Sequence, residues 1–292
     1  MKKYTLALAV AALSFTAVIQ AKTVDAVASF SVLGDIVKQV GGEHVAVKSL
    51  VGANGDPHTF EPTPQDGLAL SKANVVFVSG LGMEGWMDRL ISASGYKGKV
   101  VVASDGVSSR SMDEDGKQVT DPHAWNSMKN GVIYAQNVMN ALIAADPQDA
   151  EYFRQHGGAY IEKLRKLDSW AEQTFKAIPV AKRKVLTSHD AFGYFGQRYG
   201  VTFLSPVGFS TEAEASAGDV ARLIQQLKQE KIHTYFIENQ TDPRLVKQIA
   251  SASGAKPGGE LYPEALSDKG GDAATYTQAF EHNVKVLAAS MK

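Results

Sequence analysis

Short apolar runs alternate with helical patterns along most of the chain, and this order constrains the fold more than any other feature. The first half reads as strands at 23–30, 44–51, 74–80 and 99–104, with helices at 31–42, 63–73 and 82–94 between them. Alternation of this kind predicts a largely parallel sheet flanked by helices.

The same order restarts after residue 180. Strands are predicted at 183–188, 201–207 and 232–240, and helices at 191–200, 216–231 and 242–254, the second of these capped by Ser216. Since the chain has 292 residues, which suits two domains of ordinary size, we predict two α/β lobes.

Residues 146–178 separate the two patterns. Apolar residues including Tyr152, Tyr160, Leu164 and Phe175 recur there at spacings near three and four, with charged residues between them, which predicts one amphipathic helix with a bend near 157–158. We therefore expect an N-terminal lobe at 22–145, a linker helix at 146–178 and a C-terminal lobe at 179–292. One stiff linking helix would allow little hinge motion.

The first 21 residues have the order of a secretory signal peptide. Lys2 and Lys3 precede an apolar run from Leu6 to Ile19, and Ala21 offers a small residue for cleavage. The chain has no cysteine, so we expect neither disulfides nor a lipid-anchored N-terminus. The expected product is a free monomer in the periplasm.

Charge gives no reason to expect a nucleic-acid partner or an anionic membrane surface. The formal net charge is -1, and loss of the two lysines in the signal segment takes it to -3 (-1 - 2). A protein that binds a polyanion through its surface charge needs a basic excess, which this chain lacks.

Two of the seven histidines share the same setting. His58 lies in GDPHTFEPTPQD and His123 in TDPHAW, and each follows an Asp-Pro pair that stiffens the backbone. His189, in LTSHDAF, and His58 both follow predicted strands, and ligands of parallel sheets bind at that edge. The other four histidines are isolated and are interpreted as ordinary surface or structural residues: His44, His156, His233 and His282.

Three imidazoles that converge from separate loops suit a metal ion such as zinc, and one carboxylate would complete four ligands. The candidates from the residues alone are Glu264, Asp268 and Glu238. Glu61, Asp190 and Glu238 are candidates to accept the second ring N–H of the histidines.

The sequence resembles the metal-binding solute-binding proteins of ABC importers, the cluster A-I family, which serve zinc, manganese and iron. The resemblance spans the mature chain, and the segments that carry it are GDPHTFEPTPQD, TDPHAWNS, TSHDAFGYFGQRYGV, SPVGFSTEAEAS, FIENQ and LYPEALSDKGGDAATYTQAFEHNVKVLA. It implies two α/β lobes joined by a rigid helix, with metal held between them and passed to an inner-membrane permease. The protein would be a receptor and not an enzyme.

The resemblance also implies a ligand set of His58, His123, His189 and Glu264. Members of the family usually have an aspartate at the fourth position, so Glu264 departs from the pattern and Asp268 is a rival. Histidine at position 189 goes with zinc-type members, and zinc is therefore the expected cargo, with manganese or iron as the alternative. A zinc hydrolase is a remoter alternative, because no HExxH pair is present.

Overall fold

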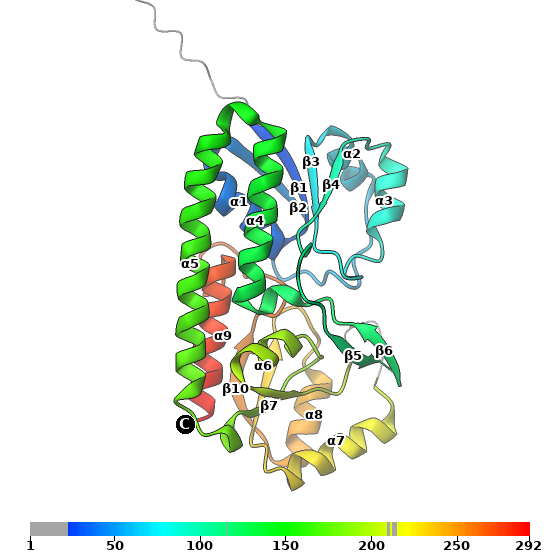
Figure 1. Cartoon of the computed structure of the whole chain (residues 1–292). Coiled ribbons are helices and arrows are strands. Elements are labelled where there is room, and N and C mark those ends of the chain that lie inside the picture. Colours follow the sequence, from blue (N-terminus) through cyan, green and yellow to red (C-terminus); the bar gives the residue numbers. More distant parts are fainter. Residues whose placement is uncertain (1–22, 115, 209–210, 212–214) are drawn as a thin grey trace, which may run out of the picture.

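The strands of both halves assemble into parallel sheets, as the alternating pattern predicts. The structure, a computed structural model, describes residues 23–114, 116–208, 211 and 215–292; the predicted signal peptide lies outside this range. One sheet has the strand order β2-β1-β3-β4 and the other β10-β9-β7-β8, with parallel pairing throughout both sheets. The two sheets belong to separate lobes (Figure 1).

The N-terminal half of the chain contains the first sheet, its helices and a small antiparallel hairpin that lies beside the C-terminal lobe (Figure 1). Its elements are β1 (Val24–Phe30), α1 (Ser31–Gly41), β2 (Val45–Val51), α2 (Pro64–Lys72), β3 (Val75–Val78), α3 (Met87–Ser94), β4 (Lys99–Val102), β5 (Ser111–Glu114), β6 (Lys117–Thr120) and α4 (Met128–Ala145). Short 3-10 turns occur at Gly42–His44 and Ala124–Asn126.

The C-terminal lobe repeats the arrangement with shorter strands. Its elements are β7 (Lys184–Leu186), α6 (Gly193–Tyr199), β8 (Thr202–Leu204), α7 (Ala217–Gln229), β9 (Thr234–Glu238), α8 (Arg244–Ser253), β10 (Lys256–Leu261) and α9 (Tyr276–Ser290). The Ser216 hydroxyl caps α7 by accepting from the Asp219 N–H, as predicted.

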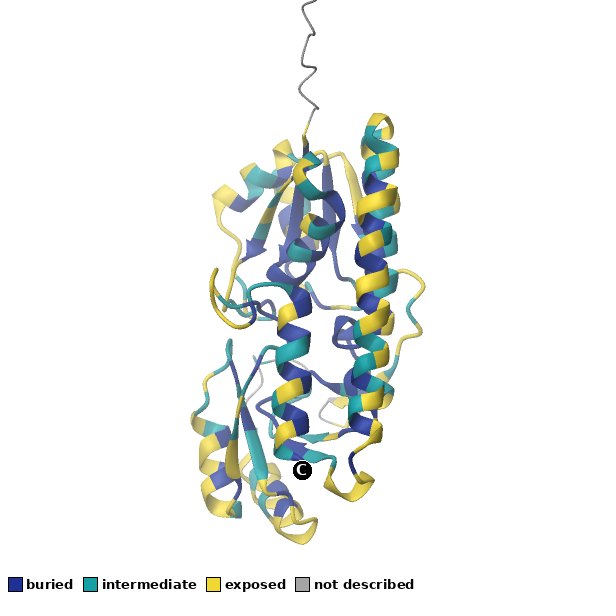
Figure 2. Cartoon of the chain, turned by 90° about the vertical axis from the view of Figure 1, so that its left-hand side faces the viewer, coloured by how far each residue is buried: buried dark blue, intermediate teal, exposed yellow. Residues whose placement is uncertain are grey.

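Helix α5 (Ala150–Lys176) links the lobes and is 27 residues long. It packs against α1 and α4 of the first lobe and against α6 and α9 of the second (Figures 1 and 2). The helix is unbroken through Gly157 and Gly158, and Figure 1 shows no sharp kink along it where a bend was expected. Gly157 serves packing instead: a Cβ atom there would lie 2.6 Å from the Met139 sulfur of α4.

The core is formed by the inward faces of the helices and by the strands. In β1 and β3 nearly every residue is buried, as expected for strands covered on both faces. Buried apolar residues of α4, α5 and α9 continue this core into the C-terminal lobe, and Figure 2 shows buried residues alternating with exposed ones along α5 and α9. A smaller separate cluster, which includes Leu186, Leu227 and Ile249, stabilises the outer part of that lobe.

The start of one predicted helix was wrong, and one hairpin was missed. Helix α3 begins at Met87 and not at residue 82, because Gly80, Leu81 and Gly82 all have positive φ and the Glu84 carboxylate accepts the backbone N–H groups of Ser79 and Gly80. The hairpin of β5 and β6 was not predicted, since the apolar alternation that marks strands is weak in 111–120.

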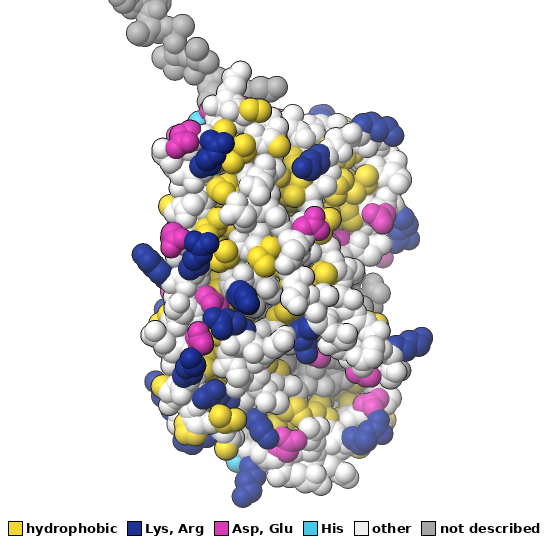
Figure 3. All heavy atoms as spheres, viewed as in Figure 1, with side chains coloured by type: hydrophobic (Ala, Val, Ile, Leu, Met, Phe, Trp, Pro, Cys, Tyr) yellow, Lys and Arg dark blue, Asp and Glu magenta, His cyan; other side chains and the backbone are white. Residues whose placement is uncertain are grey.

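On the face drawn in Figure 3, cationic and anionic side chains are interspersed, without a broad patch of either sign. Within the described ranges, no helix has the length and apolar character required to cross a bilayer.

Candidate metal centre

The two Asp-Pro-His segments form the same backbone turn. The Asp56 carboxylate accepts the His58 backbone N–H at 2.8 Å, and the Asp121 carboxylate accepts the His123 backbone N–H at 3.0 Å. An aspartate side chain that bonds the backbone two residues on is an Asx turn, which proline at the middle position stabilises. Each histidine therefore leaves a stiff loop in a fixed direction.

His189 is held by a carboxylate at the end of the neighbouring strand β9. Glu238, the last residue of β9, accepts the backbone N–H groups of Ser188 and His189 at 2.9 and 3.2 Å. Its other oxygen lies 2.5 Å from His189 Nδ1. Because Nδ1 is engaged in this way, His189 Nε2 is directed away from Glu238 and toward the space between the lobes.

Glu264 lies in the loop that follows β10. The Trp125 indole donates to the carbonyl of Pro263, the preceding residue, at 2.7 Å, and the Gln240 amide donates to Glu264 Oε1 at 2.8 Å. Asp268, the rival fourth ligand, is exposed and accepts from the Asn54 side chain at 3.0 Å. The fold thus directs Glu264, and not Asp268, toward the three histidines.

These four side chains converge on one point. His58, His123, His189 and Glu264 each offer a ligand atom, and the four atoms lie within 4.8 Å of one another. His58 Nε2 is 3.2 Å from His123 Nε2 and 3.0 Å from Glu264 Oε2, and His189 Nε2 is 2.8 Å from Glu264 Oε1. The side chains of all four are at most 3% exposed.

Charge inside the site is strongly coupled. Burial would lower the pKa of His189, but Glu238 and Glu264 outweigh burial and raise that pKa well above its ordinary value. Burial would raise the pKa of Glu264, but its electrostatic interactions with His58 and His189 hold that pKa well below its usual range. The metal-free site therefore keeps a buried carboxylate beside protonated imidazole.

The donor set fits a divalent transition metal. His189 Nε2 and Glu264 Oε2 are both buried, and neither atom has a well-aligned hydrogen-bond partner among the described residues. This holds although His189 Nε2 lies close to Glu264 Oε1 and His58 Nε2 lies close to Glu264 Oε2. Buried polar atoms without hydrogen bonds are costly unless another ligand engages them. Three imidazole nitrogens and one carboxylate oxygen can form the closed tetrahedral shell that zinc prefers.

Three carboxylates were predicted to accept the second ring N–H of the histidines, and the structure places them differently. Glu238 contacts His189 as described above. Glu61 is exposed, and among the described residues no hydrogen bond joins either Glu61 or Asp190 to the three histidines. Burial and the nearby Asp121 charge raise the pKa of Asp190.

Asp121 was missed as a partner of His123. Its carboxylate lies 2.9 Å from His123 Nδ1 and also contacts the Arg110 guanidinium. Burial opposes ionisation of Asp121, but the bonds from His123 and Arg110 lower its pKa. The signal was present in the repeated Asp-Pro-His motif, where the aspartate stands two residues before the histidine.

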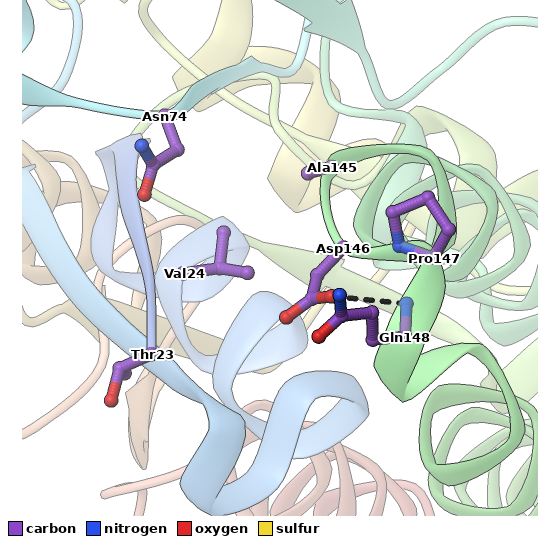
Figure 4. A pocket seen from close by; sticks show the side chains of 7 residues that line it. All are labelled: Thr23, Val24, Asn74, Ala145, Asp146, Pro147 and Gln148. Carbon is purple, nitrogen blue, oxygen red and sulfur yellow. Dashed lines mark hydrogen bonds between the residues drawn. The ribbon is translucent and has the colours of Figure 1, made fainter. Parts of the chain in front are cut away.

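The isolated histidines lie away from this cluster. His44 bonds Asp149 at 2.5 Å and stacks on Tyr152, and His282 Nε2 lies 3.0 Å from the Glu260 carbonyl oxygen. Among the described residues that line it, a cavity of about 390 Å³ at the amino end of β1 offers a single ionisable side chain, Asp146, which accepts from the Gln148 backbone (Figure 4). That cavity has too few ligands for a metal ion.

The comparison with known families agrees with this geometry. The family profile described as zinc-uptake complex component A, periplasmic (ZnuA), matches residues 26–290. The chain belongs to the ZnuA family.

Two relatives of the chain are named for manganese. The chain is 32% identical over 267 residues to the manganese ABC transporter substrate-binding lipoprotein PsaA of Streptococcus pneumoniae, covering 88% of this chain and 86% of PsaA. It is 31% identical over 266 residues to the manganese-binding lipoprotein MntA of Halalkalibacterium halodurans, covering 91% and 87%.

Solved structures show the same two-lobed fold. The periplasmic zinc-binding protein TroA of Treponema pallidum superposes with a TM-score of 0.86 at 29% identity, covering 92% of this chain and 99% of TroA. A manganese-bound mutant of the periplasmic metal-binding protein of Candidatus Liberibacter asiaticus gives a TM-score of 0.86 at 27% identity, covering 92% and 100%.

Membership of the ZnuA family defines the class of protein. The family consists of substrate-binding receptors of ABC transporters and not of enzymes, so the hydrolase alternative is set aside. Several relatives are named lipoproteins, and these names lend no support to the expected absence of a lipid anchor.

Proposed function

We propose that this protein captures a divalent transition metal, most readily zinc, in the site formed by His58, His123, His189 and Glu264, and delivers it to an inner-membrane ABC permease. The observation that carries the proposal is the convergence of four buried ligand atoms within 4.8 Å. Nothing in this role requires bond chemistry, because a closed shell of four protein ligands leaves no position for a reacting water.

The donor atoms favour zinc over manganese. Manganese prefers oxygen ligands, whereas imidazole nitrogen suits zinc, and this site offers three nitrogens. The usual order of divalent metals also places zinc above manganese and iron at almost any such site, so the cargo in the cell depends on metal supply as well as on affinity. We further propose that the mature protein works as a monomer in the periplasm after removal of residues 1–21.

Metal analysis and titration test the proposed function. Protein purified from its native periplasm is expected to carry one equivalent of metal, and the metal-stripped protein is expected to bind one zinc. His58→Ala is expected to abolish stoichiometric retention, and His156→Ala, which replaces an exposed histidine on α5, serves as the matched control. Metal-free wild-type protein together with an unchanged titration of the His58 variant would show that the proposal is wrong.

Zinc affinity is expected to rise with pH beyond the ordinary histidine range. Glu238 and Glu264 raise the pKa of His189 in the metal-free protein, so zinc must displace a proton from His189 at neutral pH. Free histidine titrates near pH 6.5, and the loss of affinity on acidification should therefore begin above that value. Calorimetry in two buffers of different ionisation enthalpy should show about one proton released per zinc near pH 7; release of none would contradict this.

Zinc affinity is expected to rise with pH, whereas the contribution of His189 to the stability of the metal-free protein is expected to fall with pH. The pKa of His189 is higher in the folded protein than in the unfolded chain. Its contribution to the free energy of unfolding is therefore fully present below the unfolded-state pKa and is lost as pH rises through the folded-state pKa. Thermal unfolding of metal-free protein should therefore show this contribution fading at alkaline pH, while zinc-bound protein gains stability there.

A further inference from the structure

The loop that carries Glu264 is attached to the opposite lobe. Leu266, two residues after Glu264, donates its backbone N–H to the Ser31 hydroxyl at 3.0 Å and accepts at its carbonyl from the Asn54 backbone N–H at 2.9 Å. Ser31 begins α1 and Asn54 follows β2, so both partners belong to the N-terminal lobe. Both backbone groups of one residue are thus used to join the lobes.

Asn54 adds two side-chain bonds to the same contact. Its amide nitrogen donates to Asp268 at 3.0 Å, and its amide oxygen accepts from the Asn239 amide at 3.0 Å. Asn239 donates in addition to the Ala265 carbonyl at 3.2 Å. Asn54 has a φ of 55°, in the left-handed region that asparagine tolerates better than other non-glycine residues, so its backbone conformation is adapted to this position.

The contacts around Asn54 lie close in the chain to residues of the metal site. Asn54 itself is four positions before His58, in the same loop. Asn239 stands between Glu238, which holds His189, and Gln240, which donates to Glu264. Ala265 is adjacent to Glu264 in the chain. A displacement of Asn54 would therefore move the Glu264 loop relative to His58.

We propose that Asn54 is a positioning residue that clamps the Glu264 loop to the N-terminal lobe and so slows metal release. Glu264 belongs by sequence to the C-terminal lobe, but the clamp and the Trp125 bond to Pro263 keep it with His58 and His123. His189 remains as the ligand supplied by the C-terminal lobe. The inference rests on the proposed function, because it assigns Asn54 a role at that same site.

Asn54→Gly is the variant that tests the clamp. Glycine adopts positive φ without strain, so the backbone bond to Leu266 is kept and only the two side-chain bonds are removed. We expect zinc to dissociate into excess chelator on the order of tenfold faster, from the loss of two hydrogen bonds. Asn239→Ala should accelerate zinc dissociation to a similar extent. Asn54 and Asn239 share one hydrogen bond, so the fold increase in the double variant should be smaller than the product of the fold increases in the two single variants.

The control and a metal-free measurement complete the test. Asn140→Ala removes an exposed asparagine whose side chain bonds Gln136 one turn away on α4, and its zinc dissociation rate should equal that of the wild type. In protein without metal, hydrogen exchange of the 262–268 loop should be faster in Asn54→Gly and unchanged in Asn140→Ala.

Unchanged exchange of the loop in Asn54→Gly would overturn the clamp, and so would faster exchange with an unaltered zinc dissociation rate. A purely structural role would lower the melting temperature of the metal-free protein without a selective change in that rate. Failure of the proposed function would be recognised separately, because wild-type protein itself would then bind no zinc.

Discussion

Replacement of Glu264 by glutamine is expected to weaken zinc binding on the order of 100-fold. Structural zinc sites bind with about 10 to 16 kcal/mol, so one ligand of four contributes roughly 3 kcal/mol, which corresponds to about two powers of ten. Glutamine keeps the shape of the side chain and removes its charge. Competition with a chelator of known affinity gives the ratio, and it is measured at alkaline pH, where protonation of His189 competes least with zinc.

Asp268→Asn is the matched control for this change. Asp268 is exposed, and among the described residues its side chain bonds only to Asn54. Asparagine can still accept that bond, so zinc affinity should stay within a few-fold of wild type. If Asp268→Asn caused the large loss and Glu264→Gln did not, Asp268 would be the fourth ligand. Glu264→Gln should also release less than one proton per zinc near pH 7, because Glu264 is one of the two carboxylates that raise the pKa of His189.

His189→Glu, made together with Glu238→Gln, is expected to shift the ratio of zinc to manganese affinity toward manganese on the order of 10- to 100-fold. The substitution exchanges one nitrogen ligand for oxygen, which costs zinc more than manganese. Competition titrations of both metals against the same fluorescent chelator measure the ratio, and a ratio equal to that of wild type would contradict the expectation.

The second substitution is required by the surroundings of His189. Glu238 lies 2.5 Å from His189 Nδ1 and Glu264 lies 2.8 Å from Nε2, so a glutamate alone at position 189 would place three buried carboxylates together. Like charges at this distance are costly in a buried site. His189→Glu alone should therefore lower the melting temperature of the metal-free protein, and Glu238→Gln should restore part of it.

Much of the fold was predictable because its signals are local. Parallel βα alternation, the cap at Ser216 and the amphipathic pattern of α5 each depend on residues close together in the chain. Predictions failed where a local pattern met a tertiary constraint. The Glu84 carboxylate accepts two backbone N–H groups just before the predicted third helix, and the first residues of that prediction form a loop. Helix α5 continues unbroken through Gly157, where Met139 packs closely.

The histidines of the candidate site could be selected from the sequence because each has a recognisable local setting. Two follow Asp-Pro, and His58 and His189 follow strands whose carboxyl ends lie at the ligand-binding edge of a parallel sheet. The chain by itself thus determined the two lobes, the helix between them and the three imidazoles directed toward the space that separates them.

Only the tertiary structure shows that Glu264 lies beside the three histidines while Asp268 does not, that Asp121 and Glu238 pair with their histidines, and that Asn54 joins Asn239. Glu264 and Asp268 lie in one short loop with similar neighbours, so no local pattern separates them. The choice depends on how that loop packs against Trp125, Ser31 and Asn54, which are far from it in the chain. Contacts between distant segments follow from the packing of two lobes, and periodicity and spacing do not encode them.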